Sequence, residues 1–414
     1  MKKLFAIFIV LSMVLTFTTA CDSGTQQPSG GSGETAPASG GNVDAPKGSD
    51  APIPAPDSGA SGTFNGVINI GALASITGNP LNGLHMVRGI EMALAEVNAR
   101  GGVLGKEVRL IFEDSSNQPD IGINAANRLA STDVVAIVGP HYSSVAMAVE
   151  AIMAQEQIPM LFGGTSPRLV QEVNNDWIFR VRASDLIQAR AAANYLVTVI
   201  GATRVGIMHG SDEFGVGGME VASQYFDEVG VEWVAEAHNV DDRDVTGQVS
   251  SMRAANIDAV LIWSVENPWI VVARQMFEQG LHVPVISNPT LFVQSAIDQF
   301  QPQWVEGFYG VSDFMTTNPD PVLQDFIARY EAKYDTLPDL HVAAYYGAAL
   351  LIVDAIERAG SAERDAIRQA LMETKNFQAI VGVLNANEHG EMVHEISIGR
   401  MENLEPYFLQ VIQG

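Results

Sequence analysis

Two loops rich in hydroxyl groups and glycine contain the residues best suited to hold a small anion. The run VVAIVGPHYSS leads from a buried strand into a predicted helix and places Ser143 and Ser144 at the N-terminus of that helix. The run IPMLFGGTSP leads in the same way through Gly163 and Gly164 to Thr165. Free backbone N–H groups and the positive end of the helix dipole make such termini anion sites. The same hydroxyls are also ordinary N-caps, so both interpretations stay open on these residues alone.

No pattern for covalent or metal chemistry accompanies these loops. Ser143 does not lie in a G-x-S-x-G elbow, and the segment GALASITG lacks the G-x-G-x-x-G dinucleotide fingerprint. The eight histidines are scattered without H-x-x-H or H-E-x-x-H spacing, which argues against a metal site. Among them, His141 directly precedes the two serines and could face the cleft, but a surface position is the favoured interpretation. We therefore expect a protein that is not an enzyme and that needs no cofactor.

The only cysteine of the chain, Cys21, follows an export signal. Residues 1–20 begin with Lys2 and Lys3, continue through an apolar run and end in small residues, the pattern of a signal peptide. A cysteine after small residues resembles the lipobox of bacterial lipoproteins, which implies acylation of the thiol. Thr18 departs from that motif, which usually has an aliphatic residue here, and the alternative is a chance cysteine near an ordinary cleavage site. No second stretch contains the roughly 18 apolar residues that cross a membrane.

The segment 21–64 is predicted to be a disordered tether for the lipid anchor. It consists mainly of Gly, Ser, Pro and Ala, and such a composition cannot bury enough apolar surface to offset the entropy of ordering. As a flexible coil it would span about 35 Å on average. Stable anchoring needs two or more acyl chains, which the lipoprotein resemblance implies.

The acidic balance of the chain excludes some partners. The formal net charge is −25, whereas proteins that bind nucleic acid need basic surfaces. The same charge disfavours adhesion to anionic lipid headgroups, so we expect membrane contact only through the lipid anchor. Beyond these exclusions, a high negative charge indicates little more than solubility.

Strands and helices alternate along the remaining 350 residues, which are too many for one ordinary core. Apolar runs such as VINIGAL, VRLIFED and VVAIVG are separated by amphipathic stretches, of which residues 83–99 form the first predicted helix. The alternation restarts after the predicted helix 184–199 with RVGIMHG. Continuous apolar strands between helices indicate parallel sheets covered on both faces. The fold class is therefore α/β, with two doubly wound parallel-sheet lobes.

The order of several motifs resembles a known family. FNGVINIGALASITGNPLNG, NARGGVLGK followed by a strand and an acidic pair, VVAIVGPHYSS, IPMLFGGTSPRL and WIFRVRASDLIQA occur in the order of type I periplasmic binding proteins. The similarity covers residues 65–412 and is closest to the leucine/isoleucine/valine-binding branch that serves ABC importers. It implies two lobes joined by three hinge crossings, with the ligand in the cleft between them. The lobes are expected at 65–185 plus 313–394, and at 186–312 plus 395–414.

The resemblance also implies roles for individual residues. In amino-acid-binding relatives, hydroxyls at the positions of Ser143 and Thr165 and the backbone of Gly163 and Gly164 hold the α-carboxylate of the ligand. Asp185 matches an acidic position near the ammonium group of the ligand. Its competing interpretation is a place in the N-cap region of the following helix.

Other positions depart from the family pattern. Asn82 falls in the first loop where relatives have tryptophan, and Phe214 replaces a tyrosine. A further aromatic position falls at Val265-Glu266, and Thr290 falls where relatives have the acid that meets the ammonium group. Glu266 could replace that acid, or the ligand could be a carboxylate or amide without an ammonium group. The nearby Trp263 and Trp269 either line the cleft or, as is more common beside a strand, belong to the core.

These features together predict a receptor for a small solute. Its lobes would close around the ligand and present the closed form to permease subunits of an ABC importer. A sensor that passes the closed state to a signalling protein is the alternative. The protein is expected to be an exported monomer, held by its lipid on the outer face of the cell membrane or in the periplasm.

Overall fold

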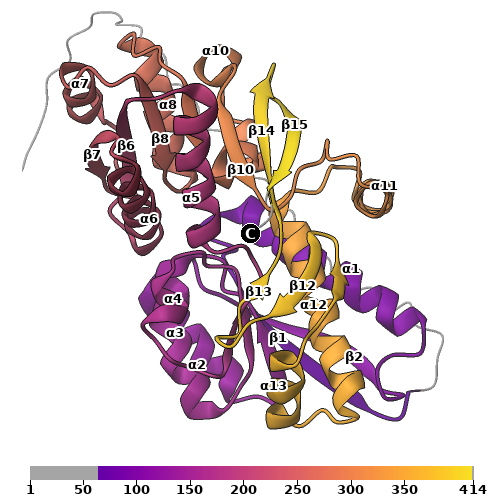
Figure 1. Cartoon of the computed structure of the whole chain (residues 1–414). Helices are drawn as coiled ribbons and strands as arrows, with labels where there is room; N and C mark the ends of the chain where they lie inside the picture. Colours follow the sequence, from indigo (N-terminus) through magenta and orange to yellow (C-terminus); the bar gives the residue numbers. More distant parts are fainter. Residues whose placement is uncertain (1–63, 413–414) are drawn as a thin grey trace, which may run out of the picture. The chain divides into compact units, whose positions relative to one another are not determined.

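The computed structural model describes residues 64–412 of the 414-residue chain. The predicted signal peptide, Cys21 and all but the last residue of the predicted tether lie outside the described residues. Their proposed roles therefore stay predictions. Within the described part, two large sheets and one small one carry the fold (Figure 1).

The first large sheet is built from the N-terminal strands and is parallel throughout. Its order is β2-β1-β3-β4-β5. The strands are β1 (Val67–Ala74), β2 (Glu107–Asp114), β3 (Val134–Val138), β4 (Met160–Phe162) and β5 (Ile178–Arg180). Four of these strands are mostly buried, as expected of strands that helices cover on both faces. By contrast, most residues of the edge strand β2 are partly or fully exposed.

The second large sheet has seven strands in the order β15-β14-β10-β9-β8-β6-β7. Its central strands are parallel, and β14 and β15 add an antiparallel edge. The strands are β6 (Arg204–Gly210), β7 (Glu232–His238), β8 (Ala259–Trp263), β9 (Val285–Ser287), β10 (Tyr309–Ser312), β14 (Ile396–Glu402) and β15 (Glu405–Ile412). A small antiparallel sheet is formed by β11 (Phe377–Ala379), β12 (Gly382–Ala386) and β13 (Met392–Val393).

Helices fill the connections between these strands. Those that accompany the first sheet are α1 (Pro80–Ala99), α2 (Pro119–Ala130), α3 (Ser143–Glu156) and α4 (Arg168–Gln171). The middle of the chain contains α5 (Asp185–Tyr195), the π-helix η1 (Leu196–Ile200), α6 (Glu213–Val229), α7 (Thr246–Ala254), α8 (Glu266–Glu278), the 3₁₀ helix η2 (Pro289–Phe292), α9 (Gln294–Ile297) and α10 (Pro302–Val305). The last three are α11 (Pro321–Tyr334), α12 (Leu340–Ala359) and α13 (Arg364–Met372).

The predicted fold class is confirmed, whereas one element boundary needs a correction. The sequence places Asn82 in a loop before a helix at 83–99, but α1 already begins at Pro80. The side chain of Asn79 accepts a hydrogen bond from the backbone N–H of Asn82 and caps the helix, and proline suits its first turn. Asn82 therefore lies in the first turn of α1.

The chain passes between the two large sheets three times. It leaves the first sheet after β5 and leaves the second sheet after β10, where α11 to α13 follow. It returns to the second sheet after β13. This strand membership agrees with the family pattern of three hinge crossings. The particular boundaries at residues 185, 313 and 394 stay a prediction.

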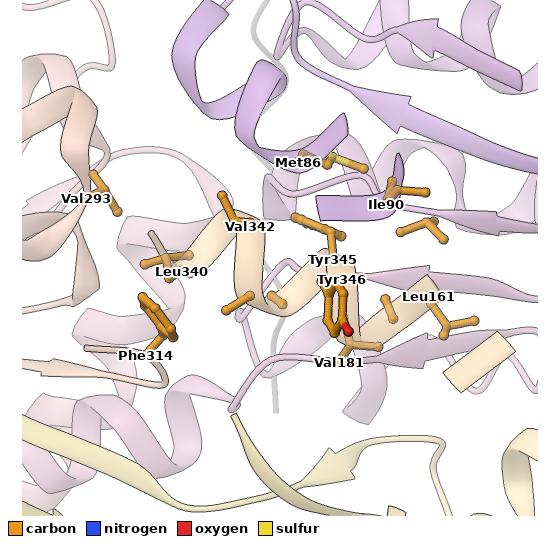
Figure 2. Close-up of a cluster of buried hydrophobic side chains, with 14 of the residues drawn as sticks. Met86, Ile90, Leu161, Val181, Val293, Phe314, Leu340, Val342, Tyr345 and Tyr346 are labelled. Carbon is orange, nitrogen blue, oxygen red and sulfur yellow. The ribbon is translucent and has the colours of Figure 1, made fainter. Parts of the chain in front are cut away.

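Helix α12 forms the centre of the largest hydrophobic core. It begins at the cap Asp339, whose carboxylate accepts the first backbone N–H groups, and ends at Gly360 in the left-handed region. In Figure 2, Tyr345 and Tyr346 of α12 lie near Met86 and Ile90 of α1, with Leu161 and Val181 close by. At the start of the same helix, Leu340 lies near Phe314, in the direction of Val293.

By length and composition, α12 is also the one described helix that could cross a membrane. The sequence had indicated no such stretch beyond the export signal. Most of α12 is buried within the protein and packs along α1, so it is a core helix.

The contact between α1 and α12 generates a stability prediction. A Cβ on Gly89 would lie 2.5 Å from the carbonyl oxygen of Val342, whereas a Cβ on Gly247 of α7 would meet nothing within 4 Å. We expect Gly89→Ala to lower the free energy of unfolding by about 1–3 kcal/mol, because the helices must move apart. Gly247→Ala should be neutral or stabilising by up to about 1 kcal/mol. Urea unfolding of both variants tests this expectation, and equal stability of the two would contradict the close packing.

Candidate functional site

A small cavity lies beyond the carboxyl ends of strands from both large sheets. Its volume is about 40 Å³. The lining residues are His141, Tyr142, Ser143, Gly163, Thr165, Arg182, Phe214, Val265, Glu266, Pro289, Thr290, Val293, Leu340 and His341. All but the last two follow a strand of one of the two sheets, and those two begin α12. Ligands of open α/β sheets bind in this position.

The hydroxyls of the first wall are not N-caps, although the sequence left that interpretation open. Helix α3 is preceded by Tyr142, which makes no side-chain cap bond. The Oγ of Ser143 instead accepts a hydrogen bond of 3.3 Å from the backbone N–H of Ser166 in the neighbouring loop. Thr165 is 2% exposed, and its Oγ1 has no hydrogen-bond partner in the part of the chain that the structure describes. Both hydroxyls are thus held at the cavity without serving a helix end.

The glycines of the same loop allow this close arrangement. A Cβ on Gly163 would lie 2.2 Å from the hydroxyl oxygen of Tyr345, and one on Gly164 would lie 2.9 Å from the Cα of Ser143. Gly163 lines the cavity, whereas Gly164 packs behind it. Ser144 lies in the first turn of α3, half-buried, and does not line the cavity. Of these residues, the structure therefore brings Gly163 but not Gly164 or Ser144 to the cavity wall.

Two arginines that sequence analysis did not select hold these loops in place. Arg180 is fully buried at the end of β5 and donates hydrogen bonds to the carbonyl oxygens of Thr165 and, at 2.8 Å, Ser166. Burial lowers the pKa of Arg180 to about 10, against the opposing charge of Glu391. Arg182, two residues later, lines the cavity itself.

Arg182 forms a bidentate ion pair with Asp313. The two hydrogen bonds measure 2.8 and 2.9 Å, and both side chains are buried. Burial alone would lower the pKa of Arg182 and raise that of Asp313, but their mutual attraction reverses both shifts. The pair is therefore charged, and the guanidinium that faces the cavity is already neutralised by a carboxylate.

Asp185 lies close to this wall but does not line the cavity. The N-cap of α5 is Ser184 and Asp185 is the first residue of the helix, so Asp185 does lie in the N-cap region. Its backbone N–H donates to the carbonyl of Thr165 at 2.9 Å, and its side chain is fully buried. Neither carboxylate oxygen meets the geometry of a hydrogen bond with a described residue. Burial raises the pKa of Asp185 to about 7, although the nearby Thr165 hydroxyl and Arg180 oppose that shift.

The opposite wall comes from the second sheet and contains Glu266, Thr290 and Phe214. Glu266 begins α8, is 6% exposed, and accepts a 2.7 Å hydrogen bond across the cleft from the Nδ2 of Asn82. Thr290 donates its hydroxyl to the carbonyl of Ser264 at 3.0 Å. Asn82 itself does not line the cavity, but its side chain contacts Glu266, which does.

The two tryptophans belong to the core. Trp263 is fully buried at the end of β8 and packs against Phe214 with 6.0 Å between ring centroids. Trp269 is also fully buried, and its Nε1–H donates to the Oγ of Ser287 at 2.6 Å. Neither lines the cavity, so their cleft-lining interpretation is wrong.

A second group that sequence analysis missed is a pair of histidines. His141 was predicted at the surface, but it is half-buried and lines the cavity together with His341. Their ring centroids are 4.2 Å apart. The prediction for His141 failed because the start of α12, some 200 residues further along the chain, covers that loop. No sequence spacing could have paired these two imidazoles.

Contacts at the rim also join the two lobes. Arg168 of α4 forms ion pairs with Glu213 and Glu220 of α6, and Ser166 donates a 2.7 Å hydrogen bond to Glu213. A Cβ on Gly217 would lie 2.8 Å from the Oγ of Ser166, so glycine permits this approach of α6. The described residues contain no cluster of side chains that could hold a metal ion.

This architecture defines a class of protein, namely a binding protein that holds a small ligand between two α/β lobes. A family model described as periplasmic binding protein matches residues 67–405, and the chain belongs to this family. Its members bind solutes rather than transform them, so the protein is not an enzyme. Membership also implies an exported, periplasmic protein.

Individual relatives are similar over most of their length. The Leu/Ile/Val-binding protein homolog 2 of Brucella abortus is 26% identical, over 80% of this chain and 89% of that protein. The leucine-binding protein LivK of Thermotoga maritima has 26% identity and a TM-score of 0.79, covering 84% of this chain and 99% of LivK. A solute-binding protein of an ABC transporter from Rhodopseudomonas palustris, in complex with 3,4-dihydroxybenzoic acid, has a TM-score of 0.76. Its 18% identity, with coverage of 84% and 97%, shows a shared fold alone.

The buried carboxyl of Asp185 generates a prediction about pH. Because its folded pKa is raised to about 7, the folded state holds this proton more tightly than the unfolded chain does. The stability that this group contributes is complete below about pH 4 and is lost as the pH rises through 7. Asp185→Asn should therefore gain stability over the wild type between pH 5 and pH 8, measured as midpoints of thermal unfolding.

The matched control for this measurement is Asp241→Asn, because Asp241 is exposed. Its stability difference from the wild type should not change between the two pH values. If the unfolding midpoints of Asp185→Asn and the wild type differ by the same amount at both pH values, the raised pKa is contradicted.

Proposed function

We propose that this protein captures a small carboxylate solute in the inter-lobe cavity and delivers it to the permease of an ABC importer. The solute is a branched-chain-type amino acid, or a related carboxylate or amide. The observation that carries the proposal is the buried hydroxyl of Thr165, which lines the cavity with Ser143. Among residues 64–412 it meets the geometry of a hydrogen bond with no group, although the carboxyl of Asp185 lies near it. Burying a hydroxyl without a hydrogen-bond partner costs free energy, and a ligand carboxylate at this position would supply an acceptor.

The names of the relatives support an amino acid. They include a Leu/Ile/Val-binding protein homolog and a leucine-binding protein. An amino acid also needs an anion for its ammonium group. Glu266 faces the cavity and offers a carboxylate, while Asp185 lies behind Thr165 as a second candidate. Thr290, the position of the usual acid, uses its hydroxyl on the carbonyl of Ser264.

Binding in this site requires movement of the lobes. A cavity of about 40 Å³ holds only a few water molecules, since one water needs at least about 10–15 Å³. A larger solute can enter only if the bonds between Asn82 and Glu266 and between Ser166 and Glu213 open and the hinge bends. A ligand that contacts both lobes would then favour the closed state, which is the form a membrane partner could distinguish.

We further propose that acylation of Cys21 keeps the receptor near its permease. A tether over residues 21–64 would leave the binding unit within about 35 Å of the membrane on average. The receptor would act as a monomer. A sensor would use the same closed state, and neighbouring genes for permease and ATPase subunits, rather than for a histidine kinase, would favour transport.

A thermal-shift screen of the full chain tests the proposed function. The panel contains amino acids, amides, aromatic acids and dicarboxylates. A ligand present at about 100 times its dissociation constant should add about 2.7 kcal/mol to the free energy of unfolding. If no carboxylate shifts the midpoint, the proposal of solute capture fails.

The role of Thr165 is tested with the ligand that the screen identifies. We expect Thr165→Ala to raise the dissociation constant about 10–100-fold, because a hydrogen bond to a charged group contributes about 1.5–3 kcal/mol. Thr165→Ser keeps the hydroxyl and is the matched control, which should bind nearly as well as the wild type. Unchanged affinity of the alanine variant would rule out contact between Thr165 and the carboxylate.

A further inference from the structure

Two imidazoles line the cavity beside the proposed carboxylate site. His141 follows β3, and His341 lies in the first turn of α12. His341 is 1% exposed, and its Nε2 has no partner among residues 64–412. Both rings line the cavity, and a Cβ on the neighbouring Gly163 would lie 3.2 Å from the Nδ1 of His141. The buried Nε2 of His341 needs a partner that an aliphatic ligand would not supply.

The carboxylate of Asp339 fixes which ring nitrogen of His341 carries hydrogen. Its Oδ2 lies 3.3 Å from the Nδ1 of His341 and 2.9 Å from the Nδ1 of His85. Burial would raise the pKa of Asp339, but the two histidines outweigh burial and hold that pKa well below its usual range. An ionised carboxylate only accepts hydrogen bonds, so Nδ1 of His341 is the donor. The Nε2 of His341, which has no partner among residues 64–412, is the ring nitrogen left for a ligand in the cavity.

Tyr345 determines which ring nitrogen of His141 carries hydrogen. Its hydroxyl oxygen lies 3.1 Å from the Nδ1 of His141, and this nitrogen is the only acceptor that the described residues offer it. Burial raises the pKa of Tyr345, so the hydroxyl keeps its proton and donates it to Nδ1. Burial also lowers the pKa of His141 well below its usual range, which keeps the ring neutral. The remaining hydrogen is on Nε2 of His141, which is therefore a donor.

The surroundings leave these two nitrogens to the ligand. The guanidinium of Arg182 is engaged by Asp313, and Leu340 and Val293 supply apolar contacts. A hydrocarbon side chain placed against the imidazoles would remove water from them without replacing its hydrogen bonds, at a cost of about 1–3 kcal/mol per group. A terminal group that has both a hydrogen-bond acceptor and a donor can replace the hydrogen bonds of the displaced water.

We propose that His141 and His341 form a polar subsite that selects a ligand ending in a carboxamide over one ending in a branched hydrocarbon. The carbonyl oxygen of the amide would accept from His141, and its NH₂ group would donate to His341. This inference rests on the proposed function, because it assumes that the carboxylate of the same ligand binds at Ser143 and Thr165. Asp339 and Tyr345 are positioning residues, which set the hydrogen on each ring.

Asparagine, leucine and aspartate provide a matched test, since their side chains branch at the same carbon and differ only in the two terminal groups. Dissociation constants are measured by calorimetry with the full chain. The wild type should bind asparagine at least tenfold more tightly than leucine, and more tightly than aspartate. His341→Leu should reduce the preference for asparagine over leucine at least tenfold, because it removes the acceptor.

Two further variants keep the test decisive. Tyr345→Phe leaves both imidazoles in place but frees the hydrogen on His141, and should weaken asparagine binding severalfold without weakening leucine binding. His282→Leu changes an exposed histidine far from the cavity lining and should leave all three constants unchanged. Should His341→Leu fail to fold, the Tyr345→Phe variant carries the comparison.

The outcomes separate this inference from the proposed function. Tightest binding of leucine would overturn the polar subsite while leaving solute capture intact. Tightest binding of aspartate would overturn the donor and acceptor roles assigned here. If none of the three binds but another carboxylate of the screen does, the carboxamide subsite is wrong and carboxylate capture stands. If no carboxylate of any kind binds, the proposed function fails as well.

Discussion

The buried ion pair between Arg182 and Asp313 is the contact on which the geometry of the cavity depends. Arg182 lies just beyond β5, where the chain leaves the first sheet, and Asp313 lies just beyond β10, where it leaves the second. His394, on the third connection, interacts electrostatically with the same carboxylate. All three connections between the sheets thus converge on one charge pair.

This pair links the hinge to the binding wall. Loss of one partner would leave a buried charge uncompensated, which typically costs 3–5 kcal/mol. Because Arg182 also lines the cavity, any displacement of the connecting segments moves a wall of the site. Arg180, two residues earlier on the same segment, fixes the carbonyls of Thr165 and Ser166. The position of the proposed carboxylate site therefore follows from the segment that joins the lobes.

The cavity wall formed by Ser143, Gly163 and Thr165 was predictable from sequence because its parts are local. Ser143 and Thr165 each follow a short apolar strand and a glycine or proline, and parallel strands bring their carboxyl ends to one edge. The alternation of strands and helices predicted the fold class for a similar reason, since it depends on neighbouring residues. Asn82 was placed wrongly in a loop, because the cap at Asn79 lengthens α1 by one turn.

The polar character of the cavity was not predictable in this way. His141 and His341 are 200 residues apart in the chain, and only the packing of α12 beside β3 brings their rings within 4.2 Å. The orientation of each ring depends on a further residue, Asp339 or Tyr345, that is itself placed by α12. A histidine in a sequence carries no information on which nitrogen will find an acceptor.

The amino-acid sequence by itself determined the α/β class, the two runs of parallel strands and the two hydroxyl-bearing loops. These features depend on apolar periodicity and on turn residues, which act over a few positions. The tertiary structure alone decided that Asp185 is buried behind the wall, that Glu266 meets Asn82 across the cleft, and that two imidazoles line the cavity. Burial, and with it the pKa of a carboxyl or the free nitrogen of an imidazole, depends on which distant segments exclude water from a group, and this is settled only when the lobes and α12 pack together.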